Sequence, residues 1–346
     1  MGRIPIFQWA NEANPLSLTS KFILPQLNRP NPTCVSHLDS VPIIDMGTDN
    51  EAQLIQEIKS ACQGFGFFQV VNHGIPLELC KNALDVNTKL FHLPYEEKSH
   101  LVTTTHLEDG KIFKYYVKDQ QTQEKISMWA ETFFHTWHPH DHGFTHNLPN
   151  NPPQYRSVIA AYATEVGSLI VKLLGLISRG LGLERDYLKT KLGQNLSYTA
   201  QANYYPPCPN PELTLGLPAH TDYNVLTILL QEEGVTGLHV LKDGNWVAVD
   251  PVPGALVVNV ADQLQILSND RYKSVYHRAV TNEEKKRVSL AMFVGPNHDT
   301  VVEPIEELID ENHPALYRRY TFGEFVREFR NQEGKPRKVK EVFKKY

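Results

Sequence analysis

The chain has 346 residues, 41% of them hydrophobic and 21% charged, so it can bury the core of an ordinary globular protein. A net charge of −5 argues against nucleic-acid and anionic-membrane partners, and no run approaches the roughly 18 apolar residues of a membrane span. Four cysteines without a CxxC pair argue against a thiolate zinc site or a disulfide framework, and no signal peptide is evident, so we expect a cytoplasmic protein. We also expect it to be a monomer.

The first half of the chain is predicted to be mostly helical. Residues 1–40 carry several prolines and are expected to wrap over the surface. Short buried strands are expected at 41–45 and 65–74. Apolar residues at helical spacing predict helices at 51–64, 76–91, 154–181 and 186–192.

The second half changes to short strands broken by turns. Strands are expected at 197–205, 225–231, 237–242, 246–249, 255–260, 275–281, 287–294 and 300–303. About eight such strands predict a jelly roll. Helix is expected to return after residue 304, notably at 321–329, whereas the basic run 335–340 is expected to be a solvated end.

These patterns predict one enzyme unit of mixed α/β class. We expect a mostly helical region at 1–195, a jelly-roll catalytic core at 196–303, and a C-terminal helical lid and tail at 304–346.

Three side chains form a candidate metal site. His220 and Asp222 are two positions apart, so in a strand both side chains would point to the same side. His277, on another expected strand, would complete a set of two imidazoles and one carboxylate. This set leaves three positions open on Fe(II), but zinc hydrolases use the same ligand types, so the triad by itself leaves both metals open.

Arg287 and Ser289 favour iron over zinc. They share one face of the strand that follows His277. A guanidinium beside a hydroxyl suits the far carboxylate of a dicarboxylate whose other end chelates the metal. 2-Oxoglutarate has this form.

At this point the chain resembles the plant 2-oxoglutarate- and Fe(II)-dependent dioxygenases. The run Asn203-Tyr204-Tyr205-Pro206-Pro207-Cys208-Pro209 and the stretches 41–45 and 66–74 match further hallmarks of that family, so the resemblance covers roughly residues 20–330. It implies a distorted double-stranded β-helix, a jelly-roll variant, framed by the N-terminal and C-terminal helices.

The resemblance also implies the cofactors and their ligands. His220, Asp222 and His277 would hold Fe(II) as the catalytic triad. The 2-oxoglutarate-binding residues would be Asn203, Tyr205, Arg287 and Ser289. Oxygen would be the second co-substrate, with ascorbate as a supporting reductant. The implied reaction converts 2-oxoglutarate to succinate and CO2 while a small molecule is hydroxylated, desaturated or cyclised.

The substrate pocket is implied less directly. By resemblance it would be lined by Glu131, Thr132, Phe134, His135, Gln201, Phe293, Gly295 and Phe322. Phe134 and Phe293 would suit an aromatic substrate, whereas Glu131 would suit the ammonium group of an alkaloid.

Two groups of dioxygenases share more local detail with the chain. Residues 203–281 resemble the downy-mildew-resistance oxygenases, which act on salicylate and flavanones. The N-terminal half and residues 103–142 resemble hyoscyamine 6-hydroxylase, which oxidises a tropane alkaloid. We rank a phenolic or flavonoid substrate above an alkaloid. A zinc metallohydrolase and a non-catalytic 2-oxoglutarate sensor are the alternatives from other classes.

Several histidines and one cysteine receive structural interpretations. His73 is interpreted as a hydrogen-bonding turn residue. The dense histidine run at 135–146 resembles a metal-binding tract, but a loop with partly exposed imidazoles is favoured. Cys208, between two prolines, is expected to be buried.

Overall fold

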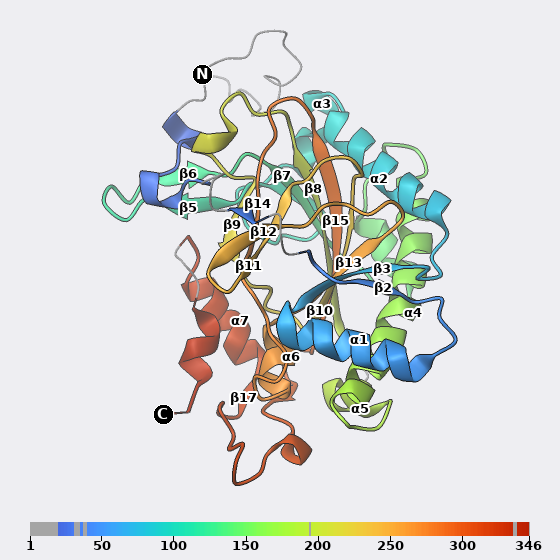
Figure 1. Ribbon diagram of the computed structural model, residues 1–346. Coiled ribbons are helices and arrows are strands. Elements are labelled where there is room, and N and C mark those ends of the chain that lie inside the picture. The colour runs from blue at the N-terminus through green and yellow to red at the C-terminus, as the bar shows by residue number, and fades with distance from the viewer. Residues whose placement is uncertain (1–19, 31–34, 37–39, 194, 335–337, 346) are drawn as a thin grey trace.

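The computed structural model describes residues 20–30, 35–36, 40–193, 195–334 and 338–345, so most of the expectation for residues 1–40, and residues 335–337 of the basic run, lie outside it. Two β-sheets form the core (Figure 1). The larger has the order β2 (Ile43–Asp45), β3 (Phe67–Val71), β13 (Leu256–Val260), β10 (Leu226–Gln231), β15 (Arg287–Gly295), β8 (Ser197–Tyr205), β7 (Glu131–Thr136) and β4 (Lys111–Phe113).

The smaller sheet has the order β1 (Val35–Ser36), β12 (Asn245–Ala248), β11 (Leu238–Lys242), β14 (His277–Ala279) and β9 (Leu217–His220). Two further strand pairs are β5 (Tyr116–Lys118) with β6 (Lys125–Ser127), and β16 (Val301–Val302) with β17 (Tyr320–Thr321). Antiparallel pairing dominates both sheets, as in the predicted jelly roll, which is confirmed.

Helices α1 (Glu51–Gly64), α2 (Leu77–His92) and α4 (Tyr155–Gly180) cover the outer face of the larger sheet (Figure 1). The other helices are α3 (Tyr95–Lys98), α5 (Tyr187–Leu192), α6 (Asp262–Leu267) and α7 (Phe322–Asn331). The 26-residue α4 packs on α1 and α2. By length and composition α4 could cross a membrane, but 56% of its most apolar window is buried inside the protein, as in a core helix.

Strand β15 shows how the sequence produces two different surfaces. Arg287, Ser289, Ala291 and Phe293 point into a pocket between the sheets. The intervening Val288, Leu290, Met292 and Val294 belong to the core under the helices. All nine residues of β15 are buried because the strand is covered on both faces.

The expected elements of both halves are largely present, but strands also occur in the region expected to be mostly helical. The strands expected at 41–45 and 65–74 are present as β2 and β3, whereas β4 and β7 were not expected; all four belong to the main sheet, which therefore crosses the expected boundary at residue 195. Strands β4, β5 and β6 have three residues each, too few to show alternation, and β7 is buried on both faces. Helix α6, inside the β region, is only six residues long.

The C-terminal segment packs against the protein, contrary to the expectation of a solvated end. Val339 and Phe343 of the short 3-10 helix Val339–Phe343 are buried, and the Phe343 ring lies 4.2 Å from that of Tyr320. The Lys340 side chain is only 14% exposed because it forms an ion pair with buried Asp262. The expectation was wrong for this lysine because a run of charges carries no information about a buried partner elsewhere in the chain.

Candidate metal and co-substrate site

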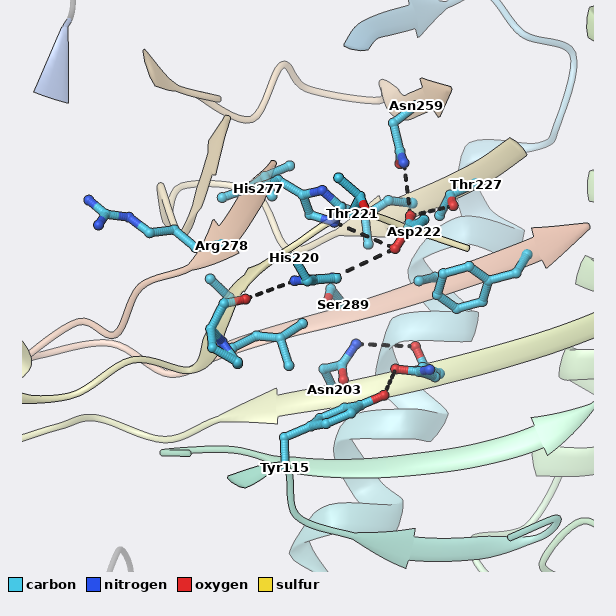
Figure 2. Close-up of a pocket in the computed structure, with 18 of the residues that line it drawn as sticks. Tyr115, Asn203, His220, Thr221, Asp222, Thr227, Asn259, His277, Arg278 and Ser289 are labelled. Atoms are coloured by element: carbon cyan, nitrogen blue, oxygen red, sulfur yellow. Dashed lines mark hydrogen bonds and ion pairs between the residues drawn. The ribbon is translucent and has the colours of Figure 1, made fainter. Parts of the chain in front are cut away.

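A pocket opens between the two sheets (Figure 2). The smaller sheet contributes His220 and His277 to its lining, and the larger sheet contributes Asn203, Arg287 and Ser289. The sandwich thus brings together residues that are separated by more than eighty positions in the sequence.

The predicted triad converges at this pocket. Both His220 Nε2 and His277 Nε2 lie 3.6 Å from Asp222 Oδ1. Their ligand atoms all lie within 4.8 Å of one another, and no other such group of three His, Cys, Asp or Glu side chains occurs in the described ranges. One cation can therefore contact all three residues.

Backbone carbonyls orient the two imidazoles. His220 Nδ1 lies 2.8 Å from the Pro218 carbonyl, and His277 Nδ1 lies 3.4 Å from the Val275 carbonyl. A carbonyl oxygen can only accept, so Nδ1 carries the proton in each ring. The Nε2 lone pairs are left for a metal, which is the usual arrangement of metal-binding histidines.

The carboxylate of Asp222 is held through one oxygen. Thr227 Oγ1 and Asn259 Nδ2 donate to its Oδ2 at 2.6 and 2.8 Å, which leaves Oδ1 facing the imidazoles. Burial raises the pKa of Asp222, but His277, His220 and these two hydrogen bonds lower it more, so the net shift is downward. The carboxylate is therefore favoured in the charged form that a cation requires.

One detail of the triad prediction was wrong. Strand β9 ends at His220, so Asp222 lies in the connection to β10 and does not share strand geometry with His220. The two side chains still meet because the backbone of this connection bonds to residues 261–263 at the start of α6.

Arg287 forms the charged end of the co-substrate region. It is 3% exposed, its Nη2 donates to Gln231 Oε1 at 2.9 Å, and its guanidinium carbon lies 5.1 Å from the centre of the Tyr205 ring. Within the described part of the chain, Arg287 Nε and Gln231 Nε2 are buried without a hydrogen-bond partner. Such orphaned donors are costly, and an anionic ligand would satisfy them.

The predicted companions of Arg287 surround it. Ser289 and Tyr205 are both buried. Burial raises the pKa of the Tyr205 phenol, and the neighbouring Arg287 and Ser289 oppose this only in part. A Cβ on Gly237 would lie 2.5 Å from Arg287 Cδ, and one on Gly216 would lie 2.4 Å from Tyr205 Cδ1. Both glycines therefore allow the backbone to approach this end closely.

The other end of the pocket is aromatic. Gln201 and Phe293, both predicted, line it together with Tyr115, Tyr223 and Phe329. Tyr115 Oη donates to Gln201 Oε1 at 3.0 Å (Figure 2). Helix α7 contributes Phe329 to the lining, whereas the predicted Phe322 lies behind Tyr223, with ring centroids 6.2 Å apart.

Two predicted pocket residues on β7 point the other way. Glu131 pairs with Lys98 at 3.5 Å, and His135 packs between Phe133 and Phe144. Neither is among the described residues that line the pocket. The physical reason is strand alternation, which the prediction neglected: in register they lie opposite Tyr204 and Ala200, on the helix side of the sheet.

The remaining predictions fall near the pocket but not on its lining. Thr132 and Phe134 face the same side as Asn203 and Gln201, and Thr132 Oγ1 donates to Asn203 Oδ1 at 2.8 Å. Gly295 lies against Asn224, where a Cβ would come within 3.1 Å of the amide oxygen.

The side chains expected to be structural are held by local contacts. His73 Nδ1 accepts from the backbone of Ile75, and its Nε2 lies 3.1 Å from the Gly254 carbonyl. The other histidines of the 135–146 run, His138, His140, His142 and His146, are exposed and form no metal-binding group in the described ranges. Cys208 is buried, and burial raises the pKa of its thiol.

Sequence reasoning missed several residues that complete the site. Asn259 is the one polar residue of β13, and Thr227 and Gln231 are the polar residues of the mostly apolar β10, a signal that could have found all three. Tyr115 and Phe329 carried no such signal, because aromatic residues near short strands or on an amphipathic helix are usually core.

Comparison with known proteins agrees with this geometry. Residues 198–296 match the family described as the 2OG-Fe(II) oxygenase superfamily, and residues 41–155 match the one described as non-haem dioxygenase in morphine synthesis N-terminal. "Flavanone 3-dioxygenase 2" of Oryza sativa subsp. japonica is 41% identical over 90% of this chain and 90% of that protein. "Protein DOWNY MILDEW RESISTANCE 6" of Arabidopsis thaliana is 40% identical over 90% and 91%.

A solved structure described as JOX2 in complex with 2OG, Fe and JA superposes with a TM-score of 0.86. It is 34% identical in sequence and covers 100% of this chain and 99% of that chain.

Proposed function

Because the chain belongs to the 2OG-Fe(II) oxygenase superfamily and is a 2-oxoglutarate-dependent dioxygenase, we propose that it oxidises a neutral, aromatic plant metabolite of the flavonoid type. The observation that carries the proposal is the contrast inside the pocket: its inner end is charged, and its substrate end is aromatic with an uncharged polar anchor.

The inner end fits the cofactors of the family, Fe(II), 2-oxoglutarate and oxygen. In the proposed assignment His220, Asp222 and His277 hold the metal, which supplies the oxygen activation that protein side chains lack. Arg287 and Ser289 receive the far carboxylate of 2-oxoglutarate, with Tyr205 closing one side. Thr227 and Asn259 hold the Asp222 carboxylate in place by hydrogen bonds to its Oδ2.

The charges around the substrate end favour a neutral ligand over an alkaloid ammonium. Asp222 is the only carboxylate among the described lining residues, and it would be a ligand of the metal. Glu131, the carboxylate expected for an alkaloid, is on the other face of β7 with Lys98. A buried ammonium ion without a counter-charge would be strongly disfavoured.

Among the described lining residues, no lysine or arginine side chain is available at the substrate end for an anionic substrate such as salicylate. Of the described lining residues, the arginines are Arg287, at the co-substrate end, and Arg278. Arg278 stacks over Trp246 at 4.2 Å and points away from the triad (Figure 2).

The substrate end has the walls and the anchor that a flavonoid requires. Phe293, Phe329 and Tyr223 provide aromatic surface for ring packing. The Gln201 amide and the Tyr115 hydroxyl, already bonded to each other, provide a donor and an acceptor for a phenol or ketone.

The alternatives from other classes have less support. A zinc metallohydrolase would leave Arg287 and Ser289 without a role. A non-catalytic sensor usually lacks one of the metal ligands or the arginine, whereas all of them converge here.

A three-substrate panel tests the proposal. Purified protein with Fe(II), ascorbate, oxygen and 2-oxoglutarate is given a flavanone, salicylate or a tropane alkaloid, and succinate release and product mass are measured. We expect flavanone-dependent succinate and a product that has gained one oxygen or lost two hydrogens. Turnover of the alkaloid or salicylate without turnover of the flavanone would overturn the proposed substrate class.

A further inference from the structure

The first turn of α6 holds the backbone that carries Asp222. The backbone N–H of Asp262 donates to the carbonyl of Asp222 itself at 2.8 Å, and that of Gln263 donates to Asn224 at 2.9 Å. The Gln263 side chain also donates to the Tyr223 carbonyl at 2.9 Å. The position of α6 therefore determines the position of the connection between β9 and β10.

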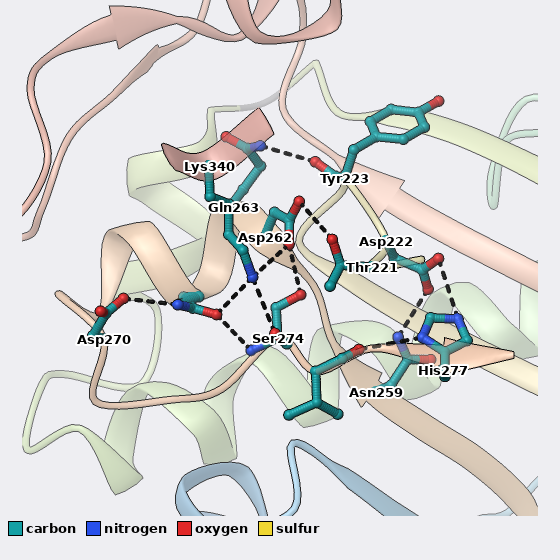
Figure 3. Close-up of polar contacts among 12 residues, drawn as sticks. Thr221, Asp222, Tyr223, Asn259, Asp262, Gln263, Asp270, Ser274, His277 and Lys340 are labelled. Atoms are coloured by element: carbon teal, nitrogen blue, oxygen red, sulfur yellow. Dashed lines mark hydrogen bonds and ion pairs between the residues drawn. The ribbon is translucent and has the colours of Figure 1, made fainter. Parts of the chain in front are cut away.

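The side chain of Asp262 extends this support to both segments that carry the triad (Figure 3). Thr221, located between His220 and Asp222, donates to Asp262 Oδ2 at 3.2 Å. Ser274, just before the strand of His277, donates to Asp262 Oδ1 at 2.7 Å. One buried carboxylate thus links the two parts of the chain that must stay in register for the three ligands to converge.

The counter-charge of Asp262 comes from the C-terminal segment. Lys340 Nζ lies 3.0 Å from Asp262 Oδ1, and the two side chains are 14% and 4% exposed. The same ammonium group donates to Gln265 Oε1 at 2.9 Å and to the Ser274 carbonyl at 3.0 Å. Both residues of the pair are thus largely removed from water, and a buried carboxylate that loses its cation is strongly destabilised.

We propose that Lys340 is a positioning residue for the metal site: the C-terminal segment supplies the cation that holds Asp262, and Asp262 holds the segments of His220, Asp222 and His277 in register. This rests on the proposed assignment of Fe(II) to the triad. Lys340 contacts none of the three ligands, so it acts on the metal only through Asp262.

Metal affinity separates this role from a general contribution to folding. Partners that orient metal ligands typically change affinity by about 10- to 100-fold when they are removed. Lys340 is one contact further away, so we expect Lys340→Met to weaken Fe(II) binding about tenfold, at the lower end of that range. Lys340→Arg, which keeps the cation, should retain most of the affinity.

The Fe(II) dissociation constant is measured without oxygen, from the visible absorption of the Fe(II) and 2-oxoglutarate complex, with thermal unfolding followed in parallel. The matched control is Lys344→Met, in the same segment, where the lysine pairs with Glu341 at a solvent-exposed position. We expect wild-type affinity for this control.

A double variant makes the test independent of folding yield. In Lys340→Met with Asp262→Asn, the carboxylate that requires a cation is gone, so Fe(II) should bind more tightly than in Lys340→Met. Wild-type Fe(II) affinity in folded Lys340→Met, or a double variant no better than the single one, would refute the inference. A wild-type protein that binds no Fe(II) would instead overturn the proposed function, and the inference with it.

Discussion

The two ends of the pocket are built in different ways. At the metal end each ligand has a hydrogen-bond partner close to it in the chain: Pro218 for His220, Thr227 for Asp222 and Val275 for His277. At the substrate end, Tyr115 comes from the connection between β4 and β5, Gln201 from β8 and Phe329 from α7.

This difference indicates which end tolerates change. Shifting a metal ligand breaks a charged, hydrogen-bonded set that must converge on one point, so small displacements are costly. The aromatic side chains of the substrate end make packing contacts that depend less on direction than the metal-ligand contacts do. One of these side chains can therefore be replaced while the others still exclude water. The chemistry of the reaction is therefore tied to one end and substrate choice to the other.

The largest effect is expected at the metal end. Replacing His220 by Ala removes one of three ligands and should reduce substrate-dependent succinate release to the level measured without added iron. His142→Ala, which alters an exposed histidine, is the control and should keep full activity. Full turnover by His220→Ala would show that the triad is not the metal site.

A smaller effect is expected from Arg287, at the inner, co-substrate end of the pocket. Arg287→Met removes a buried charged donor, and hydrogen bonds to charged groups contribute about 1.5–3 kcal/mol, so the KM for 2-oxoglutarate should rise about tenfold to a hundredfold. The variant should also lose the preference for 2-oxoglutarate over pyruvate, which lacks the far carboxylate. Competition between the two acids measures this, and an undiminished preference would contradict the assigned role.

At the substrate end a single anchor should matter less. Gln201→Leu removes the amide that meets Tyr115, and a neutral hydrogen bond contributes about 1 kcal/mol, so the KM for the flavanone should rise about fivefold. The KM for 2-oxoglutarate should stay unchanged, which initial-rate measurements with each substrate varied in turn can establish. Equal changes in both values would mean that the two ends are not separate.

The smallest effect on activity is expected from His135, one residue from Phe134 but on the other face of β7. Burial lowers the pKa of His135 to about 4, so the unfolded chain binds a proton between pH 6.5 and 4 that the folded protein excludes. Neutral His135 therefore makes its whole contribution to the free energy of unfolding above pH 6.5. This contribution, about 3 kcal/mol, is lost as the pH falls toward 4.

His135→Phe keeps a ring against Phe144 and removes the titrating group. Its free energy of unfolding should therefore decline less steeply than that of the wild type between pH 6.5 and 4, as denaturant titrations would show. The KM values should not change. A changed flavanone KM would place this position in the substrate end after all.

Local sequence patterns determined much of the fold. Periodicity predicted the apolar stripe of α4 and the alternation in β15, because helix and strand periods repeat within one element. Residue type and spacing predicted His220, Asp222, His277 and Arg287. The short strands β4, β5 and β6 were not, since three residues show no period.

The amino-acid sequence by itself determined the ligand types of the site and hence its chemistry, since imidazole, carboxylate and guanidinium have the same properties wherever they occur. Only the tertiary structure decided which face of β7 meets the pocket, so that Glu131 pairs with Lys98, and that Lys340 of the basic run pairs with Asp262. Both contacts are made with partners that are far away in the sequence. A local sequence pattern carries no information about contacts that form only when distant segments pack together in the folded protein.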